Sequence, residues 1–215
     1  MHGLPWLSGP PAEEGLGGGV LERPVLEVAR SLLGCRLVST IGGERTVGVI
    51  VETEAYGGPG DPASHAATAT GVTERNRAMF GPAGRAYVYR SYGVHWCMNV
   101  VTGREEEGQA VLLRGLEAVE GQETMLRRRG RLPLAAGPGR LCQALGITGD
   151  LYGHDLECEP LRLLRGWPVA DSFVGVSGRV GVSAAAEWPH RFYVRGSSGV
   201  SRVDGWTPNS DKSAR

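Results

Sequence analysis

The sequence predicts an α+β fold: a single domain with a curved, mostly antiparallel sheet, surrounding helices and one protruding β-hairpin. Its 215 residues fit one domain. The β-rich segments come in runs, and helical segments are interspersed without a regular alternation, which favours antiparallel pairing. A turn signal, Ser91-Tyr92-Gly93, separates two aromatic, β-rich runs and predicts the hairpin. No run of about 18 uncharged apolar residues occurs, so we expect no membrane span.

The two ends of the chain differ in composition from its middle. Residues 1–19 are interrupted by Gly and Pro and lack a hydrophobic period, so we expect a flexible N-terminal arm. Residues 207–215 are polar and predict a flexible C-terminal tail. The folded domain should therefore span 20–206. Its first element is a helix that begins at Pro24 and stops at Gly34.

Strands dominate the next part of the domain. Segments 35–40 and 46–56 read as strands joined by a turn at Gly42-Gly43. Segment 57–85 is long and irregular, with some helix near 73–80, and such loops are often functional. We further expect the hairpin within 85–101, strands at 108–114, 180–182 and 192–195, and helices at 121–129 and 138–145.

Charge and cysteine content restrict the function only partly. The chain carries 23 basic and 23 acidic residues, which argues at first against a polyanionic partner. The distribution is uneven, because residues 75–140 hold 11 arginines against 6 glutamates. Four cysteines lie far apart, without the paired spacing of a structural zinc site or a disulfide scaffold. On charge alone, nucleic acid remains a minority interpretation.

Two carboxylates lie in the apolar strand 46–56. Glu52 and Glu54 share one face of it if no bulge intervenes. A salt-bridged structural residue beside a surface residue is the simpler explanation, because burying an unpaired carboxylate is costly. Glu54 nevertheless lies where the strand enters the long loop, a common place for a site. Arg114 ends another apolar strand and needs an anionic partner, for which either glutamate is a candidate.

Aromatic residues gather in the predicted hairpin. Tyr87, Tyr89, Tyr92 and Trp96 lie within ten residues of a chain that is 7% aromatic. Cross-strand packing explains such residues inside strands. Tyr92 differs, because a large ring at a hairpin tip is badly placed for the core and well placed to wedge into a base stack. An accidentally exposed tyrosine is the alternative.

The long loop and the hairpin hold further candidates. Arg75 and Arg77 add cations suited to phosphate, whereas His65 alone is more typical of a structural histidine. His95 and Cys97 could share a strand face as metal ligands. No third or fourth ligand accompanies them at a recognisable spacing, so we expect no metal.

Five segments together resemble the 3-methyladenine DNA glycosylase family of the alkyladenine (N-methylpurine) type. They are VETEAYGGPGDPASHA, TERNRAMFGPAGRAYVYRSYGVHWCMN, AVLLRGLEAVEG, GPGRLCQALGI and RFYVRGS, and the match runs from about residue 21 to 204. The resemblance implies a monofunctional enzyme of base-excision repair without a cofactor. It would flip a damaged purine nucleotide out of duplex DNA and hydrolyse the N-glycosidic bond, leaving an abasic site. Candidate bases are 3-methyladenine, 7-methylguanine, hypoxanthine and ethenoadenine.

The resemblance also implies roles for particular residues. Glu54 would be the general base, Arg114 a second residue that holds the attacking water, and a carbonyl near Val182 the third. The base would lie between Tyr56, His65 and Tyr89, with main-chain groups around Ala63 reading its edge and Asn99 excluding the guanine amino group. Tyr92 would fill the vacated place in the helix, and candidates for contact with the DNA backbone are Arg75, Arg77 and Arg90.

The expected partner is double-stranded DNA that contains damaged purines, bound by a monomer in the cytoplasm, at the nucleoid in a bacterium. The single lysine, Lys212, argues against a Schiff-base lyase mechanism. Two alternatives remain open. One is a non-catalytic nucleic-acid-binding module, in which Glu54 is structural. The other is a hydrolase of small nucleosides that uses Glu52 and Glu54 as an acid–base pair.

Overall fold

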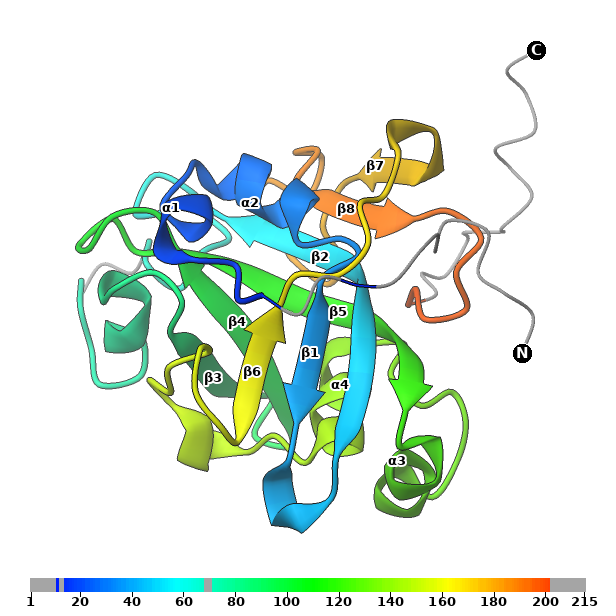
Figure 1. Cartoon of the computed structure of the whole chain (residues 1–215). Helices are drawn as coiled ribbons and strands as arrows, with labels where there is room; N and C mark the ends of the chain where they lie inside the picture. Colours follow the sequence, from blue (N-terminus) through cyan, green and yellow to red (C-terminus); the bar gives the residue numbers. More distant parts are fainter. Residues whose placement is uncertain (1–10, 12–13, 68–70, 202–215) are drawn as a thin grey trace.

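Strand β2 (Thr46–Tyr56) is the centre of the sheet in the computed structural model, which describes residues 11, 14–67 and 71–201. One edge of β2 pairs with β5 (Gln109–Glu120) along almost its whole length. The other edge pairs with β1 (Arg36–Ser39) over its first half and with β8 (Arg191–Val194) over its second half. Because β1 and β8 take different halves of one edge, the sheet curls around β2 (Figure 1).

The eight strands form one sheet whose pairings are all antiparallel. Its main path runs β3-β4-β5-β2-β1-β6, and β7 extends it beyond β8. The remaining strands are β3 (Ala86–Ser91), β4 (His95–Thr102), β6 (Leu161–Leu164) and β7 (Val174–Ser177). This architecture confirms the α+β prediction. Strands β6 and β7 were not predicted from the sequence.

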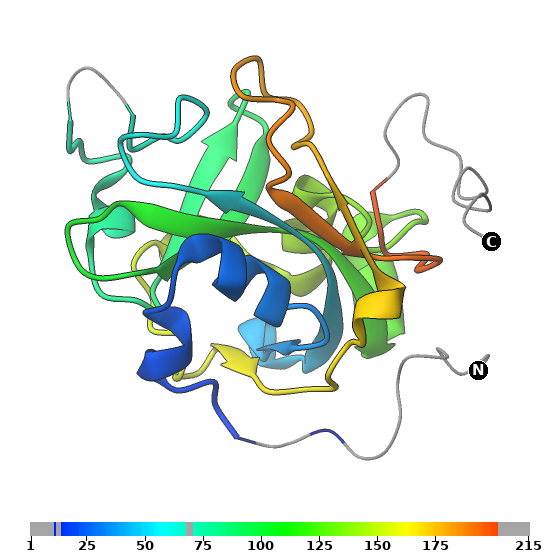
Figure 2. The same cartoon turned by 90° about the horizontal axis from the view of Figure 1, so that it is seen from above.

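Four α-helices cover the sheet in the described part of the chain. They are α1 (Gly18–Leu21), α2 (Val25–Ser31), α3 (Gln122–Arg129) and α4 (Pro138–Leu145). Helix α2 lies along β2, where the Thr53 hydroxyl donates to the Ala29 carbonyl at 2.8 Å. Helix α4 lies on the other side of the sheet, among the strands β1, β4 and β5 (Figures 1 and 2). None of these helices is long and apolar enough to cross a membrane.

Short 3₁₀ turns connect several elements: η1 (Ile41–Gly43), η2 (Arg77–Phe80), η3 (Gly149–Leu151) and η4 (Asp171–Phe173). The helix predicted from Pro24 is α2, and Gly34 ends that region with a φ of +87°. A side chain at Gly34 would collide with the backbone of Trp167, so glycine is required there. The turn at Gly42-Gly43, the helical turn near 73–80 and the helices at 121–129 and 138–145 are confirmed.

The strand predicted at 180–182 is wrong. Residues 178–190 form a loop in which Gly181 has a φ of +74°, a conformation that no regular strand adopts. The Val180 N–H does not join a strand ladder but donates to the Glu54 carboxylate. A polar side chain thus takes the hydrogen bond that strand pairing would have used.

The ends of the chain extend beyond the described residues. The predicted tail at 207–215, which contains Lys212, lies outside them, as do residues 1–10, 12 and 13 of the predicted arm. Within the described part of that arm, Gly15 forms an isolated bridge with Leu164, and Leu16 is buried.

Candidate active site

A cavity of about 610 Å³ opens beside the β3–β4 hairpin. It lies between the hairpin and two loops, 57–67 and 178–190, and the hairpin tip and these loops project from the same side of the sheet (Figure 2). Nine of the predicted site residues line it: Tyr56, Ala63, His65, Arg75, Tyr89, Tyr92, Asn99, Arg114 and Val182. Sequence segments far apart are therefore brought together around one opening.

Glu54 lies directly behind the wall of this cavity and has no exposed surface. One carboxylate oxygen, Oε1, accepts a hydrogen bond from the Val180 N–H at 2.7 Å. The other, Oε2, accepts from the Tyr56 hydroxyl at 2.9 Å and from Arg114 Nη1 at 3.4 Å. All three donors line the cavity. The acid is thus separated from the cavity only by the groups that hold it.

Burial raises the pKa of Glu54, because the charged form loses its hydration. The nearby Arg114 and the hydrogen bonds from Val180 and Tyr56 act in the opposite direction and favour the carboxylate. A carboxylate that is desolvated but still hydrogen-bonded is a stronger base than one in water. This environment suits a group that must take a proton from a water molecule near neutral pH.

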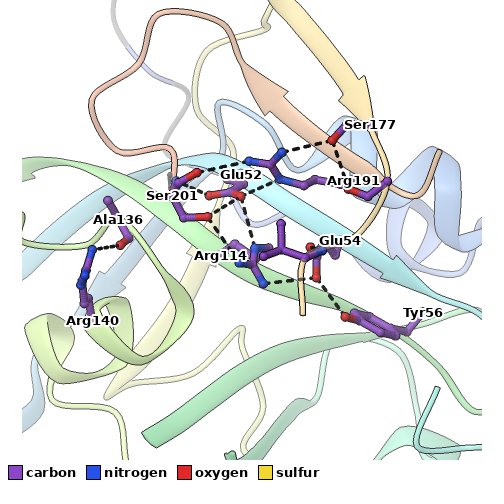
Figure 3. Close-up of polar contacts among 11 residues, drawn as sticks. Glu52, Glu54, Tyr56, Arg114, Ala136, Arg140, Ser177, Arg191 and Ser201 are labelled. Atoms are coloured by element: carbon purple, nitrogen blue, oxygen red, sulfur yellow. Dashed lines mark hydrogen bonds and ion pairs between the residues drawn. The ribbon is translucent and has the colours of Figure 1, made fainter. Parts of the chain in front are cut away.

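Glu52 has a different environment from Glu54. Its carboxylate accepts four hydrogen bonds, from Arg114 Nε at 3.2 Å, Arg191 Nε at 2.8 Å, and the Ser201 hydroxyl and N–H at 2.8 and 2.6 Å. Figure 3 shows these four side chains directed toward one another, with Glu54 on the other side of Arg114. Glu52 is fully buried and does not line the cavity. Its four bonds indicate a structural carboxylate.

Three irregularities interrupt the β2–β5 register, and two of them flank Glu52, between Ile50 and Glu52 and between Glu52 and Thr53. The sequence-based expectation of a shared face depended on their absence. Glu52 and Glu54 nevertheless both reach the Arg114 guanidinium, so the two carboxylates do lie on one side of the strand. The expected partnership of Arg114 with a glutamate is confirmed for both.

Aromatic rings line the cavity. The rings of His65 and Tyr89 meet edge to face with centroids 4.6 Å apart, and Tyr87 stacks on Tyr89 at 5.4 Å. The Tyr87 hydroxyl lies 2.7 Å from His65 Nδ1 and fixes the orientation of the imidazole. Burial, and then the charge of Arg75, lower the pKa of His65, so its ring is neutral at neutral pH. The cavity thus presents uncharged ring surfaces to a ligand.

The loop 57–67 presents main-chain groups beside these rings. The Ala63 N–H donates to Asp61 at 3.0 Å, and the Ser64 N–H donates to the Asp61 carbonyl at 2.9 Å. The His65 N–H has no hydrogen-bond partner among the described residues. Of the N–H groups around Ala63, that of His65 is the one left to bind a ligand edge.

Asn99 lines the cavity and is almost completely buried. Its Nδ2 donates to the Tyr87 carbonyl at 2.9 Å, and this bond fixes the side-chain amide. An amide held in this way fills a defined part of the cavity.

Tyr92 lies at the hairpin tip, where 91% of its surface is exposed. Its φ of +50° is followed by a φ of +71° at Gly93, as in the tight turns that connect hairpin strands. A non-glycine residue with positive φ is uncommon. The structure thus holds an apolar ring out of the protein, above the mouth of the cavity.

The three arginines predicted to contact the DNA backbone flank the hairpin. Arg75 lines the cavity and lies over the Tyr89 ring, while Arg90 lies over the Trp96 ring. All three, Arg75, Arg77 and Arg90, line a second, open groove of about 500 Å³ on the side of the hairpin. Arg77 also pairs with Glu74 on the surface.

Sequence reasoning missed several residues that shape the site. Arg179 and Asp61 form a buried ion pair between the two cavity loops, and Arg191 and Ser201 hold Glu52. Arg191 could have been found, because it begins an apolar strand and needs an anionic partner, as does Arg114, which lies within β5 and not at the strand end that the sequence predicted. Within the described ranges, no group of three His, Cys, Asp or Glu side chains is arranged to hold a metal ion.

Comparisons with known proteins agree on one family. The family model for methylpurine-DNA glycosylase matches residues 19–198. A relative from Methanoculleus marisnigri is 51% identical over 187 residues, covering 84% of this chain and 95% of the relative. Relatives from Agrobacterium fabrum and Myxococcus xanthus are 48% and 50% identical over 184 residues, covering 84% of this chain and 89% and 90% of their own lengths. All three carry the provisional name 3-methyladenine DNA glycosylase.

Proposed function

The chain belongs to the methylpurine-DNA glycosylase family, and from this premise we propose that Glu54 activates the water that cleaves the N-glycosidic bond. The protein is a 3-methyladenine DNA glycosylase, a hydrolase of N-glycosyl bonds that acts in base-excision repair. The observation that carries the proposal is the position of Glu54, whose three hydrogen-bond donors all line the cavity.

The flipped base would occupy the space between Tyr56, His65 and Tyr89. Alkylation at N3 or N7 makes a purine cationic, and an aromatic ring attracts a cation by about 0.5–2 kcal/mol. The neutral His65 adds no repulsion to such a base. Hypoxanthine and ethenoadenine are uncharged, and they would depend more on stacking and on the His65 N–H. We therefore propose a range of 3-methyladenine, 7-methylguanine and these two neutral bases.

Cleavage passes through a sugar with oxocarbenium character, which a nearby carboxylate stabilises electrostatically. Glu54 would take a proton from the attacking water, with Arg114 and the main-chain carbonyl of Val182 as the other groups that hold it. The Arg114 contact is the longest of the three to Glu54, at 3.4 Å, so a water molecule can replace it most readily. This chemistry requires neither a metal nor another cofactor.

The hairpin would keep the nucleotide extruded. Tyr92 is proposed to enter the duplex at the vacated place, where its ring replaces part of the lost stacking. Arg75, Arg77 and Arg90 would contact phosphates on the same face. We propose that the enzyme acts as a monomer on damaged duplex DNA in the cytoplasm or at the nucleoid.

The test is an excision assay on labelled duplexes that each contain one lesion. Hypoxanthine, ethenoadenine and 7-methylguanine duplexes are incubated with excess enzyme, and abasic sites are revealed by alkaline strand cleavage. We expect strand cleavage with the wild type and, with Glu54→Gln, a rate at least about 10²-fold lower at similar DNA affinity. Undiminished excision by Glu54→Gln would refute the role of this residue.

Membership of the family argues against the two alternative functions, and the same assay distinguishes each of them from a DNA glycosylase. A non-catalytic binding module would retain the duplex without producing abasic sites. A nucleoside hydrolase would release hypoxanthine from free inosine, whereas a DNA glycosylase would act on the duplex.

A further inference from the structure

A buried ion pair joins the two loops that enclose the cavity. Arg179, in the loop 178–190, donates through Nη1 and Nη2 to the two carboxylate oxygens of Asp61 at 2.5 and 2.9 Å. The Arg179 side chain has no exposed surface, and Asp61 retains 3%. Neither residue lines the cavity.

Asp61 organises the base-binding loop around this pair. Its Oδ2 accepts the Gly57 N–H and its Oδ1 accepts the Ala63 N–H, both at 3.0 Å. These bonds fix the backbone on both sides of Asp61. The bond from Ala63 also determines the path of the chain toward His65, a cavity-lining residue whose N–H has no partner among the described residues.

Arg179 also contacts the part of β2 that surrounds Glu54, the proposed general base. Its Nη1 also donates to the Ala55 carbonyl at 3.1 Å, and its guanidinium lies 4.8 Å from the centre of the Tyr56 ring. The next residue in the chain, Val180, gives its N–H to Glu54 at 2.7 Å. The position of Arg179 therefore determines where that N–H lies and supports the ring that donates to the other carboxylate oxygen.

The energetics favour a role in position over a role in stability. A buried ion pair often contributes no more stability than an apolar pair of similar size, because both ions lose their hydration. The Arg179 Nε is buried without a partner among the described residues, which adds to this cost. Burial raises the pKa of Asp61, but the hydrogen bonds from Arg179 and Ala63 outweigh it, so the net shift is downward. The pair is therefore charged at neutral pH.

We propose that Arg179 and Asp61 are positioning residues that couple base recognition to catalysis: one ion pair holds the loop that reads the base and the N–H that holds Glu54. The inference deepens the proposed function and rests on Glu54 as the base. It predicts that loosening the pair slows the chemical step more than it weakens DNA binding, because both side chains are almost completely buried.

A second consequence concerns the pH dependence of excision. If Val180 moves away, Glu54 loses a donor to its charged form and becomes harder to ionise. The acidic limb of the rate profile then moves to higher pH. The charged and titratable groups around Glu54 come from β2, β3, β4, β5 and the 178–190 loop, and they are Glu52, Tyr56, Tyr89, Cys97, Arg114 and Arg179.

The experiment compares Arg179→Lys, Asp61→Asn and the double variant with the wild type on a hypoxanthine duplex. Lysine keeps the charge but cannot form the two-pronged contact, and asparagine keeps the volume of Asp61. We expect single-turnover rates to fall by about 10-fold to 10²-fold, as for a small misplacement of catalytic groups. The Kd for the duplex should stay within about threefold of the wild-type value. The acidic limb of the pH–rate profile should move to higher pH. The double variant should be no slower than the slower single variant.

The control is another ion pair, Arg85 with Asp155 at 3.2 Å, which joins β3 to a loop away from the cavity. Arg85→Lys and Asp155→Asn should leave the rate and the pH profile unchanged. Folded Arg179→Lys and Asp61→Asn proteins with wild-type rate and profile would overturn the inference. Both variants being unfolded at the assay temperature would also overturn it, because the pair would then be structural. Absence of excision by the wild type would instead refute the proposed function.

Discussion

Glu52 and Glu54 contact the same guanidinium, that of Arg114, at 3.2 and 3.4 Å. They are two residues apart on one strand, and both are completely buried. Glu52 faces two arginines and accepts four hydrogen bonds, whereas Glu54 faces the cavity wall. Glu52 therefore holds Arg114 in place from one side, and Glu54, the proposed general base, contacts the same guanidinium from the cavity side.

The two glutamates should therefore respond differently to the same substitution. Glu52→Gln leaves Arg114 and Arg191 without their shared carboxylate, and breaking a buried pair in this way costs about 3–5 kcal/mol. We expect a clear decrease in the free energy of unfolding, measured by urea denaturation at pH 7. Glu54→Gln should lose activity without this decrease.

The raised pKa of Glu54 determines whether Glu54→Gln increases or decreases the free energy of unfolding at pH 7. Burial raises that pKa in the folded state above the ordinary value of 4.5, so the stability that the protonated form contributes is lost as pH rises through the folded-state pKa. Glutamine is neutral at every pH, so the variant does not lose this stability as the pH rises. Glu54→Gln should thus be as stable as the wild type or more stable at pH 7. A large decrease in its stability would contradict this account.

The pH profile of excision gives an independent check. Glu54 can accept a proton only when ionised, so the single-turnover rate should rise with pH through the raised pKa of this group. The acidic limb should lie above the value of 4.5 for an ordinary glutamate. We expect Glu54→Gln to retain only a slow rate without that limb. A wild-type limb at or below 4.5 would contradict the raised pKa.

The sequence was informative wherever local rules decide the structure. Helix α2 follows from Pro24 and Gly34, and the hairpin follows from two aromatic strands around Ser91-Tyr92-Gly93. The candidate role of Glu54 depended on its place at a strand end. Each of these signals lies within about ten residues, the range over which periodicity and turn chemistry act.

What could not be predicted depends on contacts distant in sequence. The sequence predicts a strand at 180–182, yet the Val180 N–H binds Glu54, 126 residues earlier. The Arg179–Asp61 pair spans 118 residues and leaves no local pattern. The register irregularities around Glu52 coincide with the place where the other edge of β2 changes its partner from β1 to β8. Such features require the assembled sheet.

Asn99 offers a test of base selection. Its amide is held by the Tyr87 carbonyl, and the residue lines the cavity. If it excludes the exocyclic amino group of guanine, Asn99→Ala should release undamaged guanine measurably, about 10-fold or more above the wild type for a loss of roughly 1.4 kcal/mol of discrimination. Hypoxanthine, which lacks that amino group, is the matched substrate, and its excision should change by less than about threefold. Equal changes for both bases would contradict the role.

Tyr92 tests whether flipping and chemistry can be separated. Its ring is 91% exposed, so Tyr92→Ala should leave the melting temperature unchanged. Without the ring, an extruded nucleotide returns to the stack more easily, because nothing occupies its place. We expect the fluorescence increase of a 2-aminopurine beside the lesion to fall severalfold. Tyr92→Phe, which keeps the ring but not the hydroxyl, should behave as the wild type. Since Glu54 is untouched, the excision rate of a lesion opposite an abasic site, where extrusion costs less, should recover toward the wild-type value. A normal fluorescence signal with Tyr92→Ala would show that the hairpin tip does not act as the wedge.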